Sequence, residues 1–295
     1  MTAAAGGLAT VRLMDARPVS GEGELADRFL ALHAAGAPLL LANAWDQGSA
    51  KLLAGLGFQA LATTSSGHAG TLGRLDGTVT RDEALAHAAA IVSATDLPVS
   101  ADLEDCFADD PAGVAETVTL VAATGLAGCS VEDFTRREEQ PIHELAFAAE
   151  RVAAAADAAH SGLARIVLTA RAENYLHGRR DLADTIARLQ AYQEAGADVL
   201  YAPGLVDLDE IRTLVAAVDR PVNVLALPGA PSVARLADAG VRRISVGGAF
   251  FYVALGGVVE AGRELLDLGT YEFWDRARAG AGVARPTFRS SPASA

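Results

Sequence analysis

The stretch YQEAGADVLYA, residues 192–202, contains the unit from which the fold is predicted. Its first half has helical character and stops at Gly196, a residue type that commonly follows the last turn of a helix. Its second half, DVLYA, is short and apolar, as expected of a buried strand. The order helix, glycine, strand returns in LLAGLGF, VAATGLAG and LADAGVR, so the chain alternates the two elements.

This alternation repeats about eight times between the termini. The predicted strands are residues 38–42, 60–64, 98–102, 128–132, 166–171, 198–202, 221–226 and 243–247. Eight parallel strands joined by crossover helices predict a closed (β/α)8 TIM barrel, in which the chemistry gathers at the C-terminal ends of the strands. The alternative is an open doubly wound sheet, which the strand count disfavours.

Composition narrows the classes of function. A chain of 295 residues, 51% of them hydrophobic, can bury one large core, so we expect a single domain over residues 21–280. Residues 1–20 and 281–295 are rich in Ala, Gly, Ser and Pro and are expected to be flexible tails. A formal net charge of −13 argues against nucleic acid or a membrane surface as partner. A small molecule is then the better expectation for a partner. Two isolated cysteines and no signal-peptide pattern favour a cytoplasmic protein.

Polar groups stand where most of the predicted strands end. They are Asn43, Trp45, Asp46, Thr64, Ser65, Ser66, Asp102, Glu104, Glu132, Asp133, Arg171, Glu173, Asn174 and Asn223. Charged residues at the C-terminal ends of barrel strands are costly to bury without partners, so together they indicate a site. For any single residue, a solvated loop charge is the alternative.

The acidic stretch VSADLEDCFADD, residues 99–110, indicates a metal ion. Along a strand Asp102 and Glu104 point the same way, so their charges repel unless a cation lies between them. With Glu132 they offer only oxygen ligands, which favour Mg²⁺ or Mn²⁺ over softer metals. Asp109 and Asp110 precede a proline and are better explained as caps of the next helix.

Arg171 is the best partner in the predicted site for a substrate carboxylate or phosphonate, although pairing with the site's own carboxylates is the structural alternative. The turn TTSSGHAG, residues 63–70, offers hydroxyls and backbone N–H groups to an anionic oxygen. Lys51 is the only lysine and lies in a predicted helix, which argues against a Schiff-base aldolase.

Several segments together resemble the isocitrate lyase and phosphoenolpyruvate mutase superfamily. They include residues 43–77, SADLEDCFADDP, SVEDF, LTARAENYL and PVNVLALPGAP, and the resemblance spans residues 32–269. It implies a barrel whose last helix is swapped between subunits, a homo-oligomer that is a dimer of such dimers, and Mg²⁺ holding a small 2-oxo or 2-hydroxy acid.

The resemblance also implies roles for individual residues. Asp102 corresponds to the direct Mg²⁺ ligand, Glu104 and Glu132 to residues that hold its waters, and Asp76 to an aspartate near the metal. Arg171 corresponds to the arginine that grips the substrate carboxylate. The candidate substrate-binding residues are Trp45, Asp46, Thr64, Ser66, Gly67, Arg171, Asn174, Asn223 and Arg136. The candidate catalytic residues are Arg171, Glu132, Asp76 and Cys106.

The sequence also departs from this superfamily. The lyases carry a Lys-x-Cys-Gly-His loop after the fourth strand, but here the loop FTRREEQPIHE, residues 134–144, has no cysteine. The lysine and asparagine of the mutases are missing too, and Arg136 and Arg137 are the remaining sources of positive charge. The usual Gly-Tyr-Gly is replaced by Cys106, Phe107 and Ala108, so Cys106 is either a catalytic thiol or a small buried residue. We expect the loop to be a mobile lid.

The preferred function is a Mg²⁺-dependent lyase that cleaves a C–C bond of a small 2-hydroxy or 2-oxo dicarboxylic acid, by retro-aldol cleavage or decarboxylation, through a pyruvate-type enolate. The alternatives are P–C bond chemistry, as a phosphonomutase or phosphonopyruvate hydrolase, and a non-catalytic metabolite-binding barrel. The last two helical runs are apolar over most of their faces, so burial against a second copy is expected.

Overall fold

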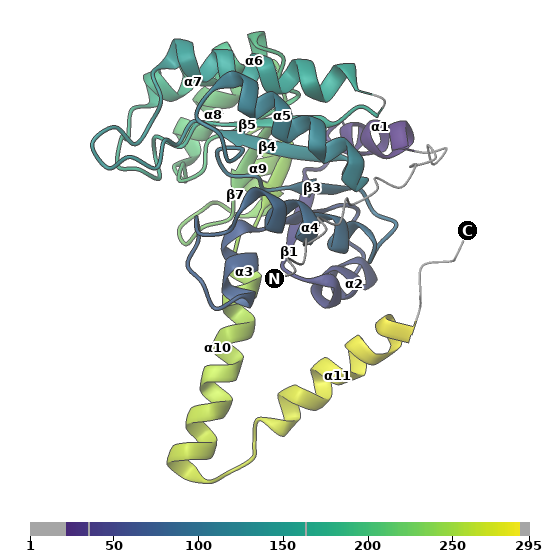
Figure 1. Ribbon diagram of the computed structural model, residues 1–295. Coiled ribbons are helices and arrows are strands. Elements are labelled where there is room, and N and C mark those ends of the chain that lie inside the picture. Colours follow the sequence, from purple (N-terminus) through teal and green to yellow (C-terminus); the bar gives the residue numbers. More distant parts are fainter. Residues whose placement is uncertain (1–21, 35, 163, 290–295) are drawn as a thin grey trace, which may run out of the picture.

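In the computed structural model, which describes residues 22–34, 36–162 and 164–289, eight parallel strands form a closed barrel (Figure 1). The strands are β1 (Leu39–Ala44), β2 (Leu61–Thr63), β3 (Val99–Ala101), β4 (Gly128–Glu132), β5 (Val167–Arg171), β6 (Val199–Tyr201), β7 (Val222–Leu225) and β8 (Arg243–Ser245). Each strand pairs with its neighbours in chain order, and β1 closes the ring against β8, with Leu41 opposite Ser245. The predicted TIM barrel is confirmed, and the open sheet is excluded.

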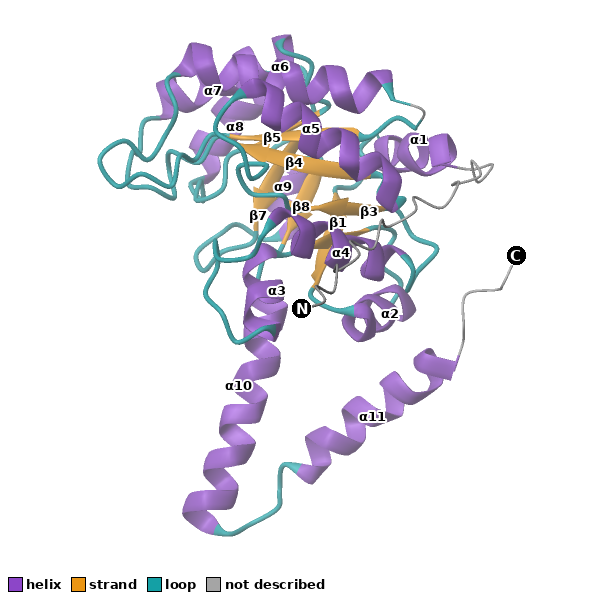
Figure 2. Ribbon diagram, viewed as in Figure 1, coloured by secondary structure: helices purple, strands orange, loops and turns teal. Residues whose placement is uncertain are grey.

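Helices form the outer layer around the strands (Figure 2). The helices of the described residues are α1 (Glu22–Leu32), α2 (Gln47–Gly55), α3 (Ser65–Thr71), α4 (Arg81–Val92), α5 (Pro111–Val121), α6 (Leu145–Ser161), α7 (Leu182–Glu194), α8 (Leu208–Ala216), α9 (Val233–Asp238), α10 (Ala249–Arg263) and α11 (Trp274–Arg289), with short helical turns η1 (Ala122–Thr124) and η2 (Glu264–Leu268); α1, α10 and α11 lie outside the layer that surrounds the strands. Many helices begin at a side chain that accepts a backbone N–H of the first turn, as Asp110 does before Pro111 at the start of α5. This confirms the capping role predicted for Asp110.

The base of the barrel is closed by α1. Its buried residues Ala26 and Phe29 pack against apolar residues that begin the strands, among them Leu39 and Val167. A larger core lies between the strands and the outer helices. Because one end of the barrel is sealed by apolar side chains, the polar interior opens only toward the C-terminal ends of the strands.

The last two helices stand apart from the barrel. Figure 1 shows α10 running away from the strands and α11 running back toward the barrel from the far end of α10. The last turns of α11 contact α2 through Thr287 and Phe288. Large apolar residues of this arm are open to solvent, with Val253 72% and Leu266 85% exposed. The apolar surface expected from the sequence is therefore present, whereas its burial in an oligomer stays a prediction.

The predicted tails differ from the structure at one end. Helix α11 continues to Arg289, past residue 280, where the sequence analysis placed the start of a flexible tail. Residues 1–20 and 290–295 of the predicted tails lie outside the described residues. Within the part of the chain that is described, no helix combines the length and hydropathy needed to cross a membrane.

Candidate active site

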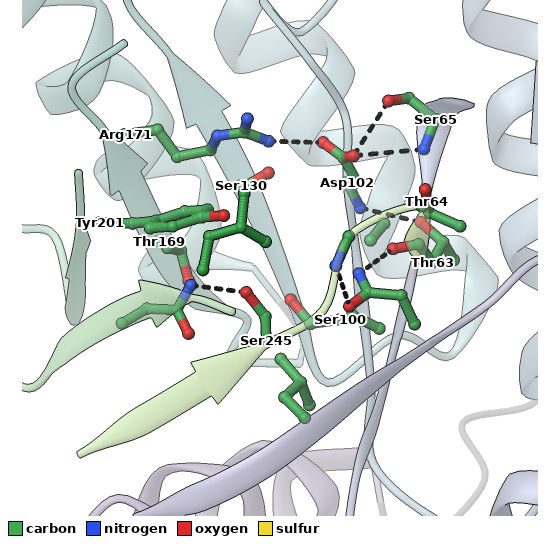
Figure 3. Close-up of a pocket in the computed structure, with 18 of the residues that line it drawn as sticks. Thr63, Thr64, Ser65, Ser100, Asp102, Ser130, Thr169, Arg171, Tyr201 and Ser245 are labelled. Atoms are coloured by element: carbon green, nitrogen blue, oxygen red, sulfur yellow. Dashed lines mark hydrogen bonds and ion pairs between the residues drawn. The ribbon is translucent and has the colours of Figure 1, made fainter. Parts of the chain in front are cut away.

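A polar pocket with a volume of about 200 Å³ lies inside the barrel and opens at the C-terminal ends of the strands. TIM-barrel interiors are usually filled by bulky branched side chains. Here the inward positions instead carry small polar residues, and those that line the pocket include Ser100, Ser130, Thr169, Asn223 and Ser245. These short side chains leave the space that forms the pocket, which Figure 3 shows in close-up.

Arg171, the last residue of β5, is the centre of charge in the pocket. Its guanidinium pairs with three carboxylates: Nη1 lies 2.8 Å from Asp102 Oδ1, Nη2 lies 3.2 Å from Glu132 Oε2, and Nε lies 2.8 Å from Glu173 Oε1. The guanidinium also lies over the ring of Tyr201, 5.1 Å from its centroid. The structure thus shows the pairing that the sequence analysis left as an alternative, and one cation is shared among three anions.

The pKa values follow from this crowding. Burial raises the pKa of Glu132 well above its ordinary value, against the attraction of Arg171, and burial raises the pKa of Glu173 as well. Burial alone would lower the pKa of Arg171, but Glu173, Glu132 and Asp102 hold it well above its usual range. Arg171 therefore stays charged at any working pH.

Asp102 follows β3 and is held from a second side. Its Oδ2 accepts hydrogen bonds from the Ser65 backbone N–H at 3.2 Å and the Ser65 hydroxyl at 3.0 Å, and Figure 3 shows Arg171 pointing at its other oxygen. The Asp102 N–H donates to Thr63 Oγ1 at 2.9 Å. A carboxylate has about four lone-pair sites, so Asp102 keeps capacity for one further ligand.

Asp76 and Glu104 add negative charge beside Asp102. Burial and repulsion by Asp102 raise the pKa of Asp76, and the same two causes raise the pKa of Glu104 to about 7 although Arg136 opposes them. Glu104 Oε2 lies 2.6 Å from Arg136 Nη2. A dication placed among these groups would relieve their repulsion, which is the relation expected of a metal site.

The carboxylate oxygens of Asp102, Glu104 and Glu132 are of the type that Mg²⁺ prefers. Among the described residues, no three His, Cys, Asp or Glu side chains converge closely enough to form a metal cage by themselves. Mg²⁺ usually keeps several waters and binds through one or two carboxylates, so a closed cage is not required. Asp102 as direct ligand, with Glu104 and Glu132 acting through water, therefore fits the residues, and these roles stay predictions.

Other predicted site residues also line the pocket. Thr64, Ser66, Asp76, Asn223 and Arg171 all contribute to its wall, as Asp102 does. Thr64 and Ser66 lie where the sequence analysis expected an open turn, but residues from Ser65 onward form the short helix α3, with Thr64 as its N-cap. Both residues still line the pocket, and their hydroxyl oxygens lie 3.2 Å apart, with Thr64 Oγ1 also accepting the Gly67 N–H.

Cys106 and Asn174, which were predicted to belong to the site, lie in the core. Cys106 has no exposed surface, its Sγ contacts the Ser130 carbonyl at 3.7 Å, and burial raises the pKa of its thiol well above the ordinary value. Asn174 is fully buried, and its amide donates to Thr185 Oγ1 at 2.6 Å. Neither side chain lines the pocket, so the reading of Cys106 as a small buried residue replaces that of a catalytic thiol.

Six more predicted residues do not line the pocket: Glu104, Glu132 and Arg136, and also Trp45, Asp46 and Gly67. Asp46 caps α2 by accepting the Ser49 N–H at 2.6 Å, and Trp45 packs against the ring of Phe251. A Cβ on Gly67 would lie 2.5 Å from Thr64 Cγ2, so this glycine serves close packing. Local structure accounts for Asp46 as a helix cap and for Gly67 at a close approach, and a role of these residues toward a substrate stays a prediction.

The loop over the acidic residues is tied down in this structure. Thr135 N donates to the Pro141 carbonyl at 2.8 Å, and Phe134 stacks on His177 with centroids 4.0 Å apart. Arg136 Nε lies 2.6 Å from Asp105 Oδ2, and its Nη1 donates to the Gly77 carbonyl at 2.7 Å. Arg136 was expected to meet substrate, but here it is held by the protein's own acceptors. The expected mobility of the loop stays a prediction.

Sequence reasoning missed several pocket residues. Ser65 was noted at a strand end but not assigned to the site, and Tyr201, Thr169 and Ser130 lie within strands. Arg243 was missed because it begins β8, whereas the site was predicted from residues at the ends of strands. In GCSVE and IVLTAR, Ser130 and Thr169 stand two residues before Glu132 and Arg171 and so on the same face of the strand, which was the signal that could have revealed a polar interior.

Comparisons with known proteins identify similar sequences and similar folds. The model of the family described as phosphoenolpyruvate phosphomutase matches residues 29–266. A solved structure of a candidate lyase or mutase from Burkholderia cenocepacia J2315 is 49% identical, covers 90% of this chain and 95% of that chain, and superposes with a TM-score of 0.86. A candidate phosphonomutase from the same organism is 37% identical, with 85% and 100% covered and a TM-score of 0.78. An oxaloacetate decarboxylase of Chromohalobacter salexigens is 29% identical, with 84% of this chain and 88% of that protein covered.

Proposed function

The chain belongs to the phosphoenolpyruvate phosphomutase family, and from this premise we propose that it is a Mg²⁺-dependent lyase that cleaves a C–C bond in a small 2-oxo or 2-hydroxy dicarboxylic acid. Proteins similar to it include lyases and mutases. The single observation that carries the proposal is the pairing of Arg171 with Asp102 in a small polar pocket. Decarboxylation of an oxaloacetate-like acid is the simplest reaction of this class.

The pocket suits a compact anionic substrate. Its volume of about 200 Å³ is enough for a diacid of four or five carbons. Arg171 presents its guanidinium in a fixed orientation because three carboxylates and the Tyr201 ring hold it. A preorganised cation of this kind lowers the barrier when negative charge develops next to it.

In a decarboxylation the bond between the departing carboxylate and the neighbouring carbon breaks. The bonding electron pair moves into the ketone to form an enolate, CO₂ leaves, and the enolate then takes up a proton. Mg²⁺, when bound, supplies Lewis-acid stabilisation of the developing charge. Arg171 orients the substrate, Asp102 is held in place by Ser65, and Thr64 and Ser66, whose hydroxyls interact with each other, line the wall that meets a substrate oxygen.

The absence of a thiol in the pocket supports decarboxylation over retro-aldol cleavage. The loop of residues 134–144 has no cysteine, and Cys106 is buried outside the pocket. Bond cleavage with loss of CO₂ needs no acid at that step, since the proton is added afterwards. The similarity to a named oxaloacetate decarboxylase points in the same direction.

P–C bond chemistry is the second candidate. It is favoured by the 37% identity to a candidate phosphonomutase whose whole chain is covered. A third reading, a barrel that binds a metabolite without turnover, predicts ligand binding with no product.

A panel of substrates separates the three. The purified protein would be given oxaloacetate, 2-methylisocitrate and phosphonopyruvate, each with Mg²⁺ and each with EDTA, against blanks without protein that correct for spontaneous decay. Pyruvate release from oxaloacetate above the blank supports the proposed lyase. Phosphate or phosphoenolpyruvate from phosphonopyruvate alone would transfer the assignment to P–C chemistry, and binding without any product would leave the third reading.

A further inference from the structure

Arg243 places a second guanidinium inside the barrel. It is the first residue of β8, and like Ser245 two residues later it lines the pocket. Arg243 is only 3% exposed. Nη2 donates to Thr169 Oγ1 at 3.0 Å, Nη1 lies 3.5 Å from His33 Nε2, and Nε has no partner. Within the part of the chain that the structure describes, its two hydrogen-bond partners are neutral groups, which do not balance its charge.

The charge balance around Arg243 is opposite to that around Arg171. Among the described residues no carboxylate forms an ion pair with Arg243, whereas Arg171 has three. Burial lowers the pKa of Arg243 to about 10, and repulsion by Arg171 acts in the same direction. A buried charge without a counter-charge is costly, so the floor of the pocket favours an anion.

His33 does not supply the missing negative charge. Its Nδ1 lies 2.9 Å from the Phe29 carbonyl, which requires the proton on Nδ1 and leaves the lone pair of Nε2 facing Arg243. Burial and the charge of Arg243 lower the pKa of His33 to about 4. The imidazole therefore stays neutral at physiological pH and accepts a weak hydrogen bond.

Two further unpartnered polar atoms lie in the same wall. Ser130 Oγ and Asn223 Oδ1 are buried without a hydrogen-bond partner, and both residues line the pocket. The Ser130 hydroxyl is free to donate. Asn223 Nδ2 now donates to Ser245 Oγ at 2.9 Å, and a half-turn of the amide would let Ser245 donate instead and turn Nδ2 toward the pocket. Figure 3 draws Ser130 and Ser245 among the side chains that line the pocket, with the Ser245 hydroxyl in its hydrogen bond to Asn223.

We propose that Arg243, Ser130 and Asn223 form a second anion site at the floor of the pocket, separate from the Arg171 cluster, and that it takes a compact monovalent anionic group. The group has two possible sources, the distal carboxylate of a dicarboxylic substrate or a free anion of the chloride class. The first source rests on the proposed function, and the second does not. In either case the anion provides the negative charge that no carboxylate of the described residues provides to Arg243.

Bromide tests the site directly, because its anomalous scattering identifies it in a crystal. Crystals of the wild-type protein soaked in sodium bromide should show an anomalous peak in contact with Arg243. The variant Arg243→Met should lose that peak while bromide elsewhere on the surface stays. If the variant does not fold, the wild-type crystal alone decides. A wild-type pocket with no bromide at Arg243, and no carboxylate there in the soaks below, overturns the proposal.

Soaks with bromide plus succinate, and with bromide plus pyruvate, distinguish the sources. Displacement of bromide by succinate but not by pyruvate assigns the site to the distal carboxylate of a diacid. Bromide that persists beside both assigns it to a free anion. The outcome is separable from the proposed function: bromide at Arg243 in a protein that turns over no diacid leaves this site standing, whereas turnover with no anion at Arg243 removes this inference alone.

Discussion

Arg136 ties the loop of residues 134–144 to the acidic stretch, and removing its side chain should loosen the cover of the pocket. Its guanidinium makes hydrogen bonds to Glu104, Asp105 and the Gly77 carbonyl, at 2.6 to 3.1 Å. The neighbouring Arg137 is exposed and contributes its backbone N–H to Thr135. Arg136→Ala is therefore the perturbation, and Arg137→Ala is its matched control.

The expected magnitudes follow from exposure. A hydrogen bond to a charged group contributes about 1.5 to 3 kcal/mol, but the Arg136 side chain is 32% exposed and solvent screening reduces the sum. We expect Arg136→Ala to lower the free energy of unfolding by about 1 to 3 kcal/mol, and Arg137→Ala to change it by less than about 0.5 kcal/mol. Loss of a lid contact should lower kcat/KM by about 10- to 100-fold, or about 1.4 to 2.7 kcal/mol.

The assay combines urea unfolding, turnover of the identified substrate and Mg²⁺ titration at pH 8, above the pKa of about 7 for Glu104. Mg²⁺ affinity of Arg136→Ala should not fall there, because the substitution removes a positive charge from beside the predicted metal ligands. A variant with full activity would show that Arg136 is ordinary surface. A variant whose Mg²⁺ affinity falls in parallel with its activity would show that Arg136 supports the metal site and not the lid.

Three further predictions concern other parts of the molecule. Cys106→Ala should keep the activity of the wild type, and thiol reagents should not inactivate the native enzyme, because the thiol is buried; rapid inactivation that maps to Cys106 would restore its catalytic role. Above pH 6.5 His33 is neutral in the folded and in the unfolded protein, but between pH 6.5 and about 4 only the unfolded chain takes up the proton. His33 should therefore lower the free energy of unfolding by about 3 kcal/mol by pH 4. Urea unfolding of His33→Gln should show a correspondingly weaker loss over this range, and identical pH profiles would contradict the burial argument. Sedimentation at micromolar concentration should show an oligomer that Val258→Glu weakens, since this α10 residue is 69% exposed in one copy; a stable wild-type monomer would refute this.

The barrel was predictable because its repeat is local. Most helices are followed closely by a glycine or proline, and the strands are short and largely apolar runs, so the period is visible without tertiary contacts. The same period placed Asp102 and Arg171 at the ends of β3 and β5, where the structure pairs them. Residues at strand ends share one rim of a barrel whatever the details of the loops.

The errors in the predicted site residues begin after the strands end, where side chains no longer alternate between two faces. After β3 ends at Ala101, Glu104, Cys106 and Phe107 all adopt positive φ, between 51° and 60°. This turn carries Cys106 back into the core, so proximity to Asp102 in sequence did not place it in the pocket. Arg243 was missed for a different reason, since it lies at the start of a strand and reaches the pocket only through the polar interior of the barrel.

The rate of pyruvate formation from oxaloacetate with Mg²⁺, compared between the wild type, Asp102→Asn and Asp109→Asn, tests the central claim most directly. Asp102→Asn keeps the shape of the side chain but removes the charge that faces Arg171, whereas Asp109 is an exposed acid of the same stretch. We expect turnover above the blank for the wild type and Asp109→Asn, and a loss of at least about 100-fold for Asp102→Asn with the fold retained. Equal rates for all three proteins, or no turnover by the wild type, would contradict a lyase built on Asp102 and Arg171.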